Sequence, residues 1–395
     1  PPRQGLANAY LIPVLASDST GVLHLLTAKG YALTLLNGEP VEANQHWVFS
    51  DGGWRHAGEI STSGRLITSI RAVTGDDGRV YVLWGDDGPL NSSAHNQLHL
   101  TRLADGMWSE SWDITDEGAS PWSYWGETDA LVEGIDDMHL FWTDSRESHV
   151  FLLGLDPVEF HKIYYRARHD GIWANARRVQ RRGAFSAGMP GVAQDGQGTI
   201  HLFWAEERAY LFRKGIRDVF HSAFARDNWS KSERLSDNRN YDDTPGAITY
   251  LQAARGPLGA VYVAWTGLRF ADRSRRESVL EFKSLMNGRW SEGSVLSHRS
   301  GKFVWVKGQN KLAGVVIQEY PSSSIRLEER SGFALYYMPL TDKGFGEKEL
   351  IASDTAEELF DAVVDAKGNQ HCVFIQPGSD KRMHLLHRVL YLQGE

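Results

Sequence analysis

The chain has 395 residues, of which 42% are hydrophobic and 23% are charged, so it can bury the core of one large all-β domain or of two smaller domains. Its net charge of −8 argues against a surface for nucleic acid or for an anionic membrane, and no apolar stretch reaches membrane-spanning length. The single cysteine, Cys372, excludes an internal disulfide. Abundant aromatic residues and 39 glycines, against 13 prolines, favour many short strands.

A strand-like segment recurs along the chain. Each copy has a turn with Gly or Asp, then about six apolar or aromatic residues with His or Tyr at one fixed place. The copies are GVLHLLT (21–27), GRVYVLWG (78–85), DDMHLFWT (136–143), GTIHLFWAE (198–206), GAVYVAWTG (259–267), the degraded LAGVVIQEY (312–320) and GNQHCVFIQ (368–376). The spacing of the fixed His or Tyr, roughly 60 residues, indicates a repeat architecture.

A second landmark runs in phase with these segments: a turn built from Asp, Asn or Gly, followed by an aromatic residue. The turns SDGGW, ADGMW, HDGIW, RDNW, MNGRW and TDKGF end at Trp54, Trp108, Trp173, Trp229, Trp290 and Phe345. Such turns predict a tight hairpin between the third and the outermost strand of each unit. Each unit then has four strands, the last being an edge strand such as NARRV (175–179) or SERLS (232–236).

Seven units of four antiparallel strands predict an all-β fold, a seven-bladed β-propeller, because such sheets bury their faces by packing between neighbours. We expect a single domain over residues 1–395, closed by an N-terminal strand at 1–8 that completes the last blade. The blades are expected at 9–62, 63–118, 119–183, 184–238, 239–298, 299–353 and 354–395.

The repeated histidines have two interpretations, metal ligands or structural groups. Tyr81 and Tyr262 stand at the same place in two units, which favours a polar-tipped aromatic side chain in the layer between sheets. Cys372 lies within the last repeated segment, which favours a buried thiol over a nucleophile.

The connections after the repeated segments carry the candidate functional residues, because loops at one end of a rigid propeller meet near its axis. These connections are rich in arginine although the chain is acidic, so the expected ligand is an anion such as a carboxylate. Neighbouring acids, among them Asp144 and Glu207, leave purely structural ion pairs open as the alternative. The candidates are His95, Asn96, Arg146, His149, Arg208, Tyr210, Arg213, Arg273, Tyr320 and Arg326.

Histidine and tyrosine beside arginine are suited to β-elimination on a uronic acid. Arginine would neutralise the carboxylate, one His or Tyr would take the C5 proton, and another would protonate the leaving oxygen. Carboxylates at the same connections leave a glycoside hydrolase open as the alternative. These carboxylates are Asp86, Asp87, Asp144, Glu206 and Glu207.

The repeat and the segment SAHNQLHL (93–100) resemble the seven-bladed propeller polysaccharide lyases, which include ulvan lyases and enzymes acting on rhamnose–glucuronate linkages. The resemblance implies that His95 faces the active cleft beside Asn96, and that Tyr210 and Arg213 act in proton transfer and carboxylate neutralisation. A further His-Asn element of ulvan lyases has no counterpart in LITSIRAVTG (66–75). An exo-acting enzyme that trims rhamnose from glucuronate in gum arabic or arabinogalactan-type glycans therefore fits better.

Sialidases and lectins are two other classes of propeller that act on or bind sugars. Sialidases need an Arg-Ile-Pro segment, which this chain does not contain. Lectins repeat their binding residues in every blade, whereas these connections differ in length and content. A non-catalytic sugar-binding lectin remains the alternative outside the enzymes.

We expect a secreted monomer that acts on a uronic-acid-containing polysaccharide and binds neither nucleic acid nor membranes. Glycosylation triplets at Asn91 and Asn228 agree weakly with secretion. The expected chemistry requires no cofactor. A structural calcium ion is compatible with a propeller channel, but the sequence reveals no cluster of metal ligands.

Overall fold

The computed structural model describes most of the chain, and the account below is confined to these residues. They are 12–28, 33–35, 40–41, 44–50, 52–60, 67–86, 97–116, 118–121, 127–146, 161–179, 186–210, 213–225, 228–236, 247–270, 276–308, 311–321, 332–356, 359–377 and 383–391. Within them the chain is all-β apart from a single 3₁₀ turn, η2 (Pro257–Gly259). No helix in this part is long and apolar enough to span a membrane.

The first three sheets are antiparallel and follow the chain from their inner to their outer strands. The first consists of β1 (Ile12–Ser17), β2 (Leu23–Ala28), β5 (Gln45–Ser50) and β6 (Gly53–Glu59). The second consists of β7 (Ile67–Thr74), β8 (Val80–Asp86), β9 (Leu98–Ala104), β10 (Met107–Trp108) and β11 (Trp112–Asp113). The third consists of β12 (Thr128–Val132), β13 (Met138–Asp144), β14 (Lys162–His169), β15 (Ile172–Trp173) and β16 (Arg177–Arg178).

The next two sheets repeat this order with longer strands. The fourth consists of β17 (Ser186–Gln194), β18 (Ile200–Tyr210), β19 (Arg213–Ala225), β20 (Asn228–Trp229) and β21 (Glu233–Arg234). The fifth consists of β22 (Ala247–Arg255), β23 (Val261–Phe270), β24 (Arg276–Met286), β25 (Arg289–Trp290) and β26 (Ser294–Ser297).

The remaining strands belong to one hydrogen-bonded sheet. It contains β27 (Ser300–Gly308), β28 (Lys311–Glu319), β29 (Phe333–Thr341), β30 (Gly344–Phe345), β31 (Glu349–Thr355), β32 (Phe360–Val364), β33 (Gln370–Pro377), β34 (Met383–Tyr391), β3 (Leu33–Leu35) and β4 (Pro40–Val41). A single parallel pair, Lys307 with Val363, joins its two halves, which are β27 to β31 and β32 to β34 with β3 and β4. Because these halves form one continuous sheet, the number of separate sheets does not give the number of blades. Seven blades therefore stay a prediction.

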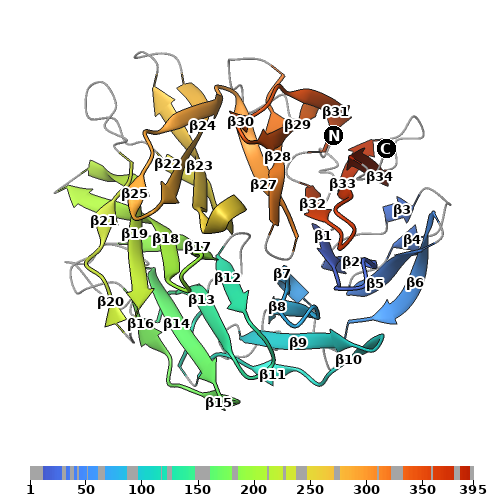
Figure 1. Cartoon of the computed structure of the whole chain (residues 1–395), viewed down its shortest axis with the longest axis horizontal. Helices are drawn as coiled ribbons and strands as arrows, with labels where there is room; N and C mark the ends of the chain where they lie inside the picture. The colour runs from blue at the N-terminus through green and yellow to red at the C-terminus, as the bar shows by residue number, and fades with distance from the viewer. Residues whose placement is uncertain are drawn as a thin grey trace, which may run out of the picture.

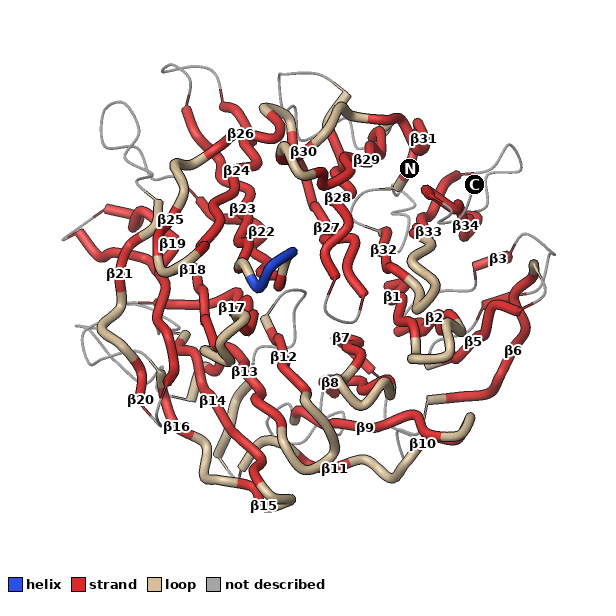
Figure 2. The backbone as a smooth tube through the Cα atoms, in the orientation of Figure 1, coloured by secondary structure: helices blue, strands red, loops and turns tan. Residues whose placement is uncertain are grey.

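Figures 1 and 2 show the sheets arranged around a central axis, with the chain running once around the ring. The described core packs between successive sheets; Leu26 of β2, for example, shares a cluster with Trp84 of β8, and Phe141 of β13 shares another with Trp204 of β18. The tryptophans of the repeated segments are almost completely buried. The fold is therefore all-β with propeller architecture, and its aromatic repeat supplies the layers between sheets.

The last sheet is completed from the first part of the chain. Strand β3, which lies between β2 and β5 in sequence, runs parallel to β34, with Thr34 opposite His384. The expected closing strand at residues 1–8 lies outside the described residues, so that expectation is neither supported nor contradicted.

The predicted turns before the aromatic landmarks are confirmed as hairpins. In β9–β10, Leu103 pairs with Trp108, and in β14–β15, Arg168 pairs with Trp173. Asp170 and Gly171, at the second of these turns, have φ of 48° and 76°, the left-handed geometry of a type I′ turn. The outermost strand is interrupted after the aromatic residue: β14 pairs with both β15 and β16, so the predicted edge strand begins anew at Arg177.

The repeated histidines are structural groups, as the substitution by Tyr favours. His201 Nε2 lies 3.2 Å from Asp195 Oδ2 in the preceding turn, and its Nδ1 lies 2.9 Å from Nε2 of His221 on β19. Tyr81 makes the equivalent contact, since its hydroxyl donates to Asp77 at 2.8 Å. Each such contact fastens a turn to the second strand of its sheet.

Candidate functional site

Five of the residues predicted to form the site lie outside the described residues. These are His95, Asn96, His149, Arg273 and Arg326. The structure therefore leaves their predicted roles untested. The sequence left open whether the protein binds a metal ion. In the described ranges, no group of three or more His, Cys, Asp or Glu side chains is placed to hold one.

Strands of the fourth sheet continue through the cationic stretch that follows Trp204. The sequence predicts a connecting loop here, but β18 and β19 form one long ladder in which Glu207 pairs with Arg217 and Tyr210 pairs with Arg213. Tyr210 and Arg213 thus occupy opposite positions at the tip of this hairpin, and Arg208 is two positions from the tip on β18. The backbone therefore brings the predicted pair together, on a ladder and not on a loop. The same correction applies to the fifth sheet, where β23 and β24 pair out to Phe270 and Arg276.

Among the arginines predicted to bind a carboxylate, Arg146 is the one whose side chain the structure describes. Its guanidinium lies 2.8 Å from Asp144 Oδ2 and 2.8 Å from Asp116 Oδ1, and 4.2 Å from the ring centroid of Tyr164. Both carboxylates neutralise its charge, which is the structural alternative that the sequence left open. Nearby carboxylates also raise the pKa of Arg146 further above its usual value, although burial opposes this.

Tyr320 directly follows β28 and is the last residue of the repeated segment LAGVVIQEY (312–320). Its amide donates to Arg299 O at 2.9 Å, and its ring centroid lies 5.4 Å from that of Phe333. These contacts place Tyr320 at the end of the sheet from which the connections with the predicted site residues leave. We call this end the loop face; there the inner strands begin and the second strands end.

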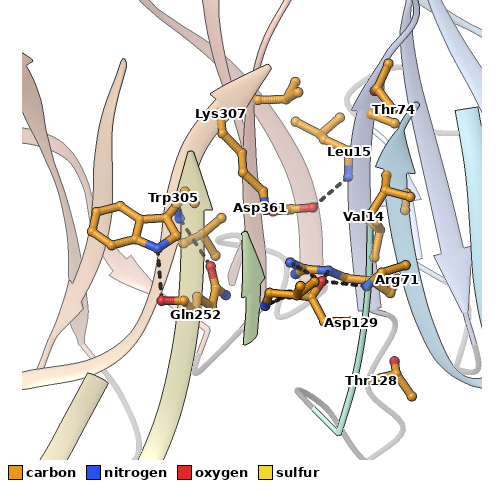
Figure 3. A pocket seen from close by; sticks show the side chains of 18 of the residues that line it. Val14, Leu15, Arg71, Thr74, Thr128, Asp129, Gln252, Trp305, Lys307 and Asp361 are labelled. Carbon is orange, nitrogen blue, oxygen red and sulfur yellow. Dashed lines mark hydrogen bonds and ion pairs between the residues drawn. The ribbon is translucent and has the colours of Figure 1, made fainter. Parts of the chain in front are cut away.

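A cavity of about 260 Å³ lies on the propeller axis. It is lined by residues of the inner strands β1, β7, β12, β17, β22, β27 and β32. Figure 3 shows charged and polar side chains from several of these strands facing this space. Four cationic residues and three carboxylates line it: Arg71, Arg255, Lys302, Lys307, Asp76, Asp129 and Asp361.

Two aspartates of the cavity connect neighbouring inner strands. Asp361 Oδ2 accepts a hydrogen bond from the amide of Leu15 at 2.8 Å, and Asp129 Oδ2 accepts one from the amide of Val192 at 2.9 Å. Asp129 also pairs with Arg71, whose Nη2 lies 3.1 Å from Oδ1. Burial raises the pKa of Asp361, while nearby Lys302 opposes that rise. These side chains hold the ring together as well as setting the charge of its axis.

Lys307 extends into the same space as Arg71, Asp129 and Asp361 (Figure 3). Burial lowers its pKa to about 8; the charge of Arg71 adds to this, and Asp129 and Asp361 oppose it. Within the described part of the chain, its ammonium has no hydrogen-bond partner. The cavity therefore contains a cation that a small anionic group could pair with.

Glu127 is a residue that the sequence analysis missed. It precedes β12 at the loop face, and its Oε2 accepts hydrogen bonds from the amide of Met189, at 3.0 Å, and from the hydroxyl of Thr143. Burial raises its pKa; these hydrogen bonds and the charge of Arg217 oppose the rise. No motif surrounds Glu127 in the sequence, because its environment comes from the adjacent sheet.

Comparison with known proteins adds the fold class. No family model and no curated protein matches the chain. Among solved structures, an ulvan lyase of polysaccharide lyase family PL25 bound to -[GlcA(1-4)Rha3S]- has a TM-score of 0.54 at 11% identity, covering 97% of this chain and 96% of that chain. An α-L-arabinanase of Penicillium chrysogenum complexed with arabinobiose has a TM-score of 0.50 at 10% identity, covering 99% and 96%. An α-L-arabinofuranosidase of Fusarium graminearum, in complex with an iminosugar inhibitor, has a TM-score of 0.50 at 13% identity, covering 80% and 89%.

The chain thus has the architecture of propeller-type carbohydrate enzymes. At these identities the likeness concerns the fold, and function has to be argued from the site. That site combines an axial cavity whose charged lining has four cations and three carboxylates, a loop face that includes the tip of the β18–β19 hairpin, and the partly buried carboxyl of Glu127 beside the cavity.

Proposed function

We propose that the protein is a secreted carbohydrate-active enzyme, a polysaccharide lyase that cleaves a rhamnose–glucuronate linkage by β-elimination. The axial cavity, whose lining has four cationic side chains against three carboxylates, is the observation that carries this proposal, because the excess of positive charge favours an anionic sugar. The fold, shared with an ulvan lyase, supports it. Exo action on gum arabic or arabinogalactan-type glycans follows from the resemblance of the sequence to lyases of that kind.

The chemistry needs a cation near the uronate carboxylate and a base at C5. Arginine or lysine lowers the energy of the enolate, in which a second negative charge develops. His95 is the proposed base, with His149 or Tyr210 as its partner, and Arg213, Arg208 and Arg146 are the proposed carboxylate ligands. The existing ion pairs of Arg146 make it the weakest member of this set.

A glycoside hydrolase acting on the same linkage, an α-L-rhamnosidase, is the second candidate. Glu127 favours it, because a partly buried carboxyl with a raised pKa is suited to protonating a glycosidic oxygen. The arabinanase and the arabinofuranosidase, which are glycoside hydrolases, also share this fold.

Incubation with gum arabic separates these candidates. A lyase releases rhamnose together with the ultraviolet absorbance of an unsaturated uronate, whereas a hydrolase releases rhamnose without it. Binding without release indicates a lectin. His95→Ala should abolish turnover and leave the melting temperature unchanged, and full activity of this variant would remove His95 from the mechanism.

A further inference from the structure

Glu127 lies next to residues that line the axial cavity. It directly precedes β12, and its backbone carbonyl accepts from the amide of Thr143 at 2.9 Å, which places it where β13 ends at the loop face. Its neighbour Thr128 and its partner Met189 both line the cavity. Glu127 is therefore on the side of the molecule from which the connections with the predicted site residues leave.

One carboxyl oxygen of Glu127 is fixed by the adjacent sheet. Oε2 accepts from the Met189 amide and from the Thr143 hydroxyl. The amide can reach it because β17 has a bulge between Gly188 and Gly191, in which Met189 has φ of 57°. A Cβ at Gly188 would lie 2.9 Å from Oε2, so a larger residue there would displace this carboxyl from its hydrogen bonds. An unfavourable backbone conformation is thus kept at the position that orients this carboxyl.

The other oxygen is left to carry a proton. Since Oε2 accepts two hydrogen bonds, the proton of the neutral carboxyl resides on Oε1, which has no hydrogen-bond partner among the described residues. Burial favours this neutral form. Among the described residues, the charge of Arg217 favours its ionised form, and Arg217 Nε is itself 3.9 Å from Glu207 Oε2.

We propose that Glu127 is the general acid that protonates the departing glycosidic oxygen. This inference rests on the proposed function, and it assigns to Glu127 the proton-donor role, which the sequence analysis left open among His95, His149 and Tyr210. In the elimination, a base removes the C5 proton, the C5–H electron pair forms the C4=C5 bond, and the C4–O bond breaks. The released oxygen takes its electron pair and the proton of Oε1, and solvent then reprotonates the carboxylate. In a hydrolysis, Oε1 gives the same proton to the glycosidic oxygen, the bond between that oxygen and the anomeric carbon of rhamnose breaks, and water adds to that carbon and loses a proton to a base.

Glu127→Gln tests the assignment with little change in structure, because the amide oxygen still accepts from Met189 and Thr143. We expect kcat/KM on the polysaccharide to fall on the order of 100-fold or more, the range for loss of a general acid or base. The basic limb of the pH profile should disappear. On a glucuronate with a nitrophenyl group on its C4 oxygen, the loss should be much smaller, since nitrophenolate leaves without a proton.

Glu133→Gln is the matched control. Glu133 directly follows β12, at the opposite end of this strand from Glu127, and its Oε1 accepts a hydrogen bond from Gln194 Nε2 at 2.9 Å. This substitution should leave the rate unchanged.

Each outcome is decisive. An inactive wild type overturns the proposed function and this inference with it. An active wild type with a Glu127→Gln variant of equal rate overturns the inference alone. Equal losses on both substrates with an unchanged pH profile indicate that Glu127 only positions other groups, which also overturns it. If Glu127→Gln does not fold, Thr143→Val decides: it removes a hydrogen bond that favours the ionised form, so the basic limb should move to higher pH, and an unmoved limb contradicts the assignment.

Discussion

Nδ1 of His24 lies 3.0 Å from Nε2 of His46, on the neighbouring strand of the first sheet. The other nitrogen of His24 lies 3.3 Å from Asp18 Oδ2. Two neutral imidazoles satisfy both contacts, because each ring supplies one N–H. A second proton on His46 would place a charge in a buried site beside another histidine, and the pKa of His46 is accordingly lowered to about 3. The contact between His24 and His46 therefore depends on a neutral His46.

The first prediction is that acid destabilises the fold between about pH 6.5 and pH 4. Burial lowers the pKa of His139, His221 and His387 to about 4, whereas the unfolded rings titrate near 6.5. Between these values the unfolded chain binds more protons, so the free energy of unfolding falls as pH falls, by roughly 1–3 kcal/mol per ring. Urea unfolding at pH 7, 6 and 5 measures this. His139→Tyr, which copies Tyr81 and Tyr262, should weaken the pH dependence, and a free energy that does not change over this range would refute the prediction.

A second prediction concerns Lys307. Its pKa of about 8 lies below the ordinary value of 10.5, so the unfolded chain binds more protons between these values. The wild type should gain stability as pH rises from 8 to 10, and Lys307→Met should be more stable at pH 7. Because Lys307 is partly exposed and solvent screens its charge, we expect a gain of roughly 1–2 kcal/mol, smaller than the full shift implies. Thermal unfolding at pH 7 checks it, and a less stable variant would show that the ammonium is well paired.

A third prediction is that Asp361→Ala weakens closure of the ring. The substitution leaves the amides of Leu15 and Ala362 without their carboxylate acceptor at a buried position. We expect a loss of roughly 2–4 kcal/mol in the free energy of unfolding. Asp342→Ala, at an exposed turn, is the control and should change little. Equal stability of the two variants in urea would show that other contacts close the ring.

A fourth prediction separates structure from function at Arg146. Arg146→Met leaves the completely buried Asp144 without its cation, so the free energy of unfolding should fall by roughly 3 kcal/mol or more. If Arg146 is only structural, kcat/KM well below the melting temperature should stay near that of the wild type. A higher KM for a variant as stable as the wild type would instead indicate that Arg146 binds the substrate carboxylate.

The repeat was predictable because its signals are local. Apolar segments ending at Trp142 or Trp204 give the second strands, and Asp-Gly before an aromatic residue gives the hairpins, since only a few residues adopt left-handed φ. The long ladder of the fourth sheet was not predictable in this way. Its tip contains charged residues without alternation, and pairs such as Glu207 with Arg217 are visible only once the strands are paired.

The polar groups of the axis depend on neighbouring sheets, so the sequence analysis did not find them. Glu127 receives its partner from β17, and Asp361 bonds to β1, at the other end of the chain. One signal was available: the inner strands TDALV (128–132) and FDAVV (360–364) both place Asp at their second residue. This shared position predicts the two inter-sheet hydrogen bonds that Asp129 and Asp361 make. The predicted residues of the connections stay predictions.

Pairing of Thr34 with His384 has a consequence for how the chain folds. Partners separated by almost the whole chain meet late, because loop closure over that length is entropically unfavourable. Until they meet, β34 presents an unpaired outer edge that can bind a strand of another molecule. Assembly on refolding should therefore be slow and increasingly prone to aggregation at high protein concentration, even though the first five sheets each form from adjacent sequence.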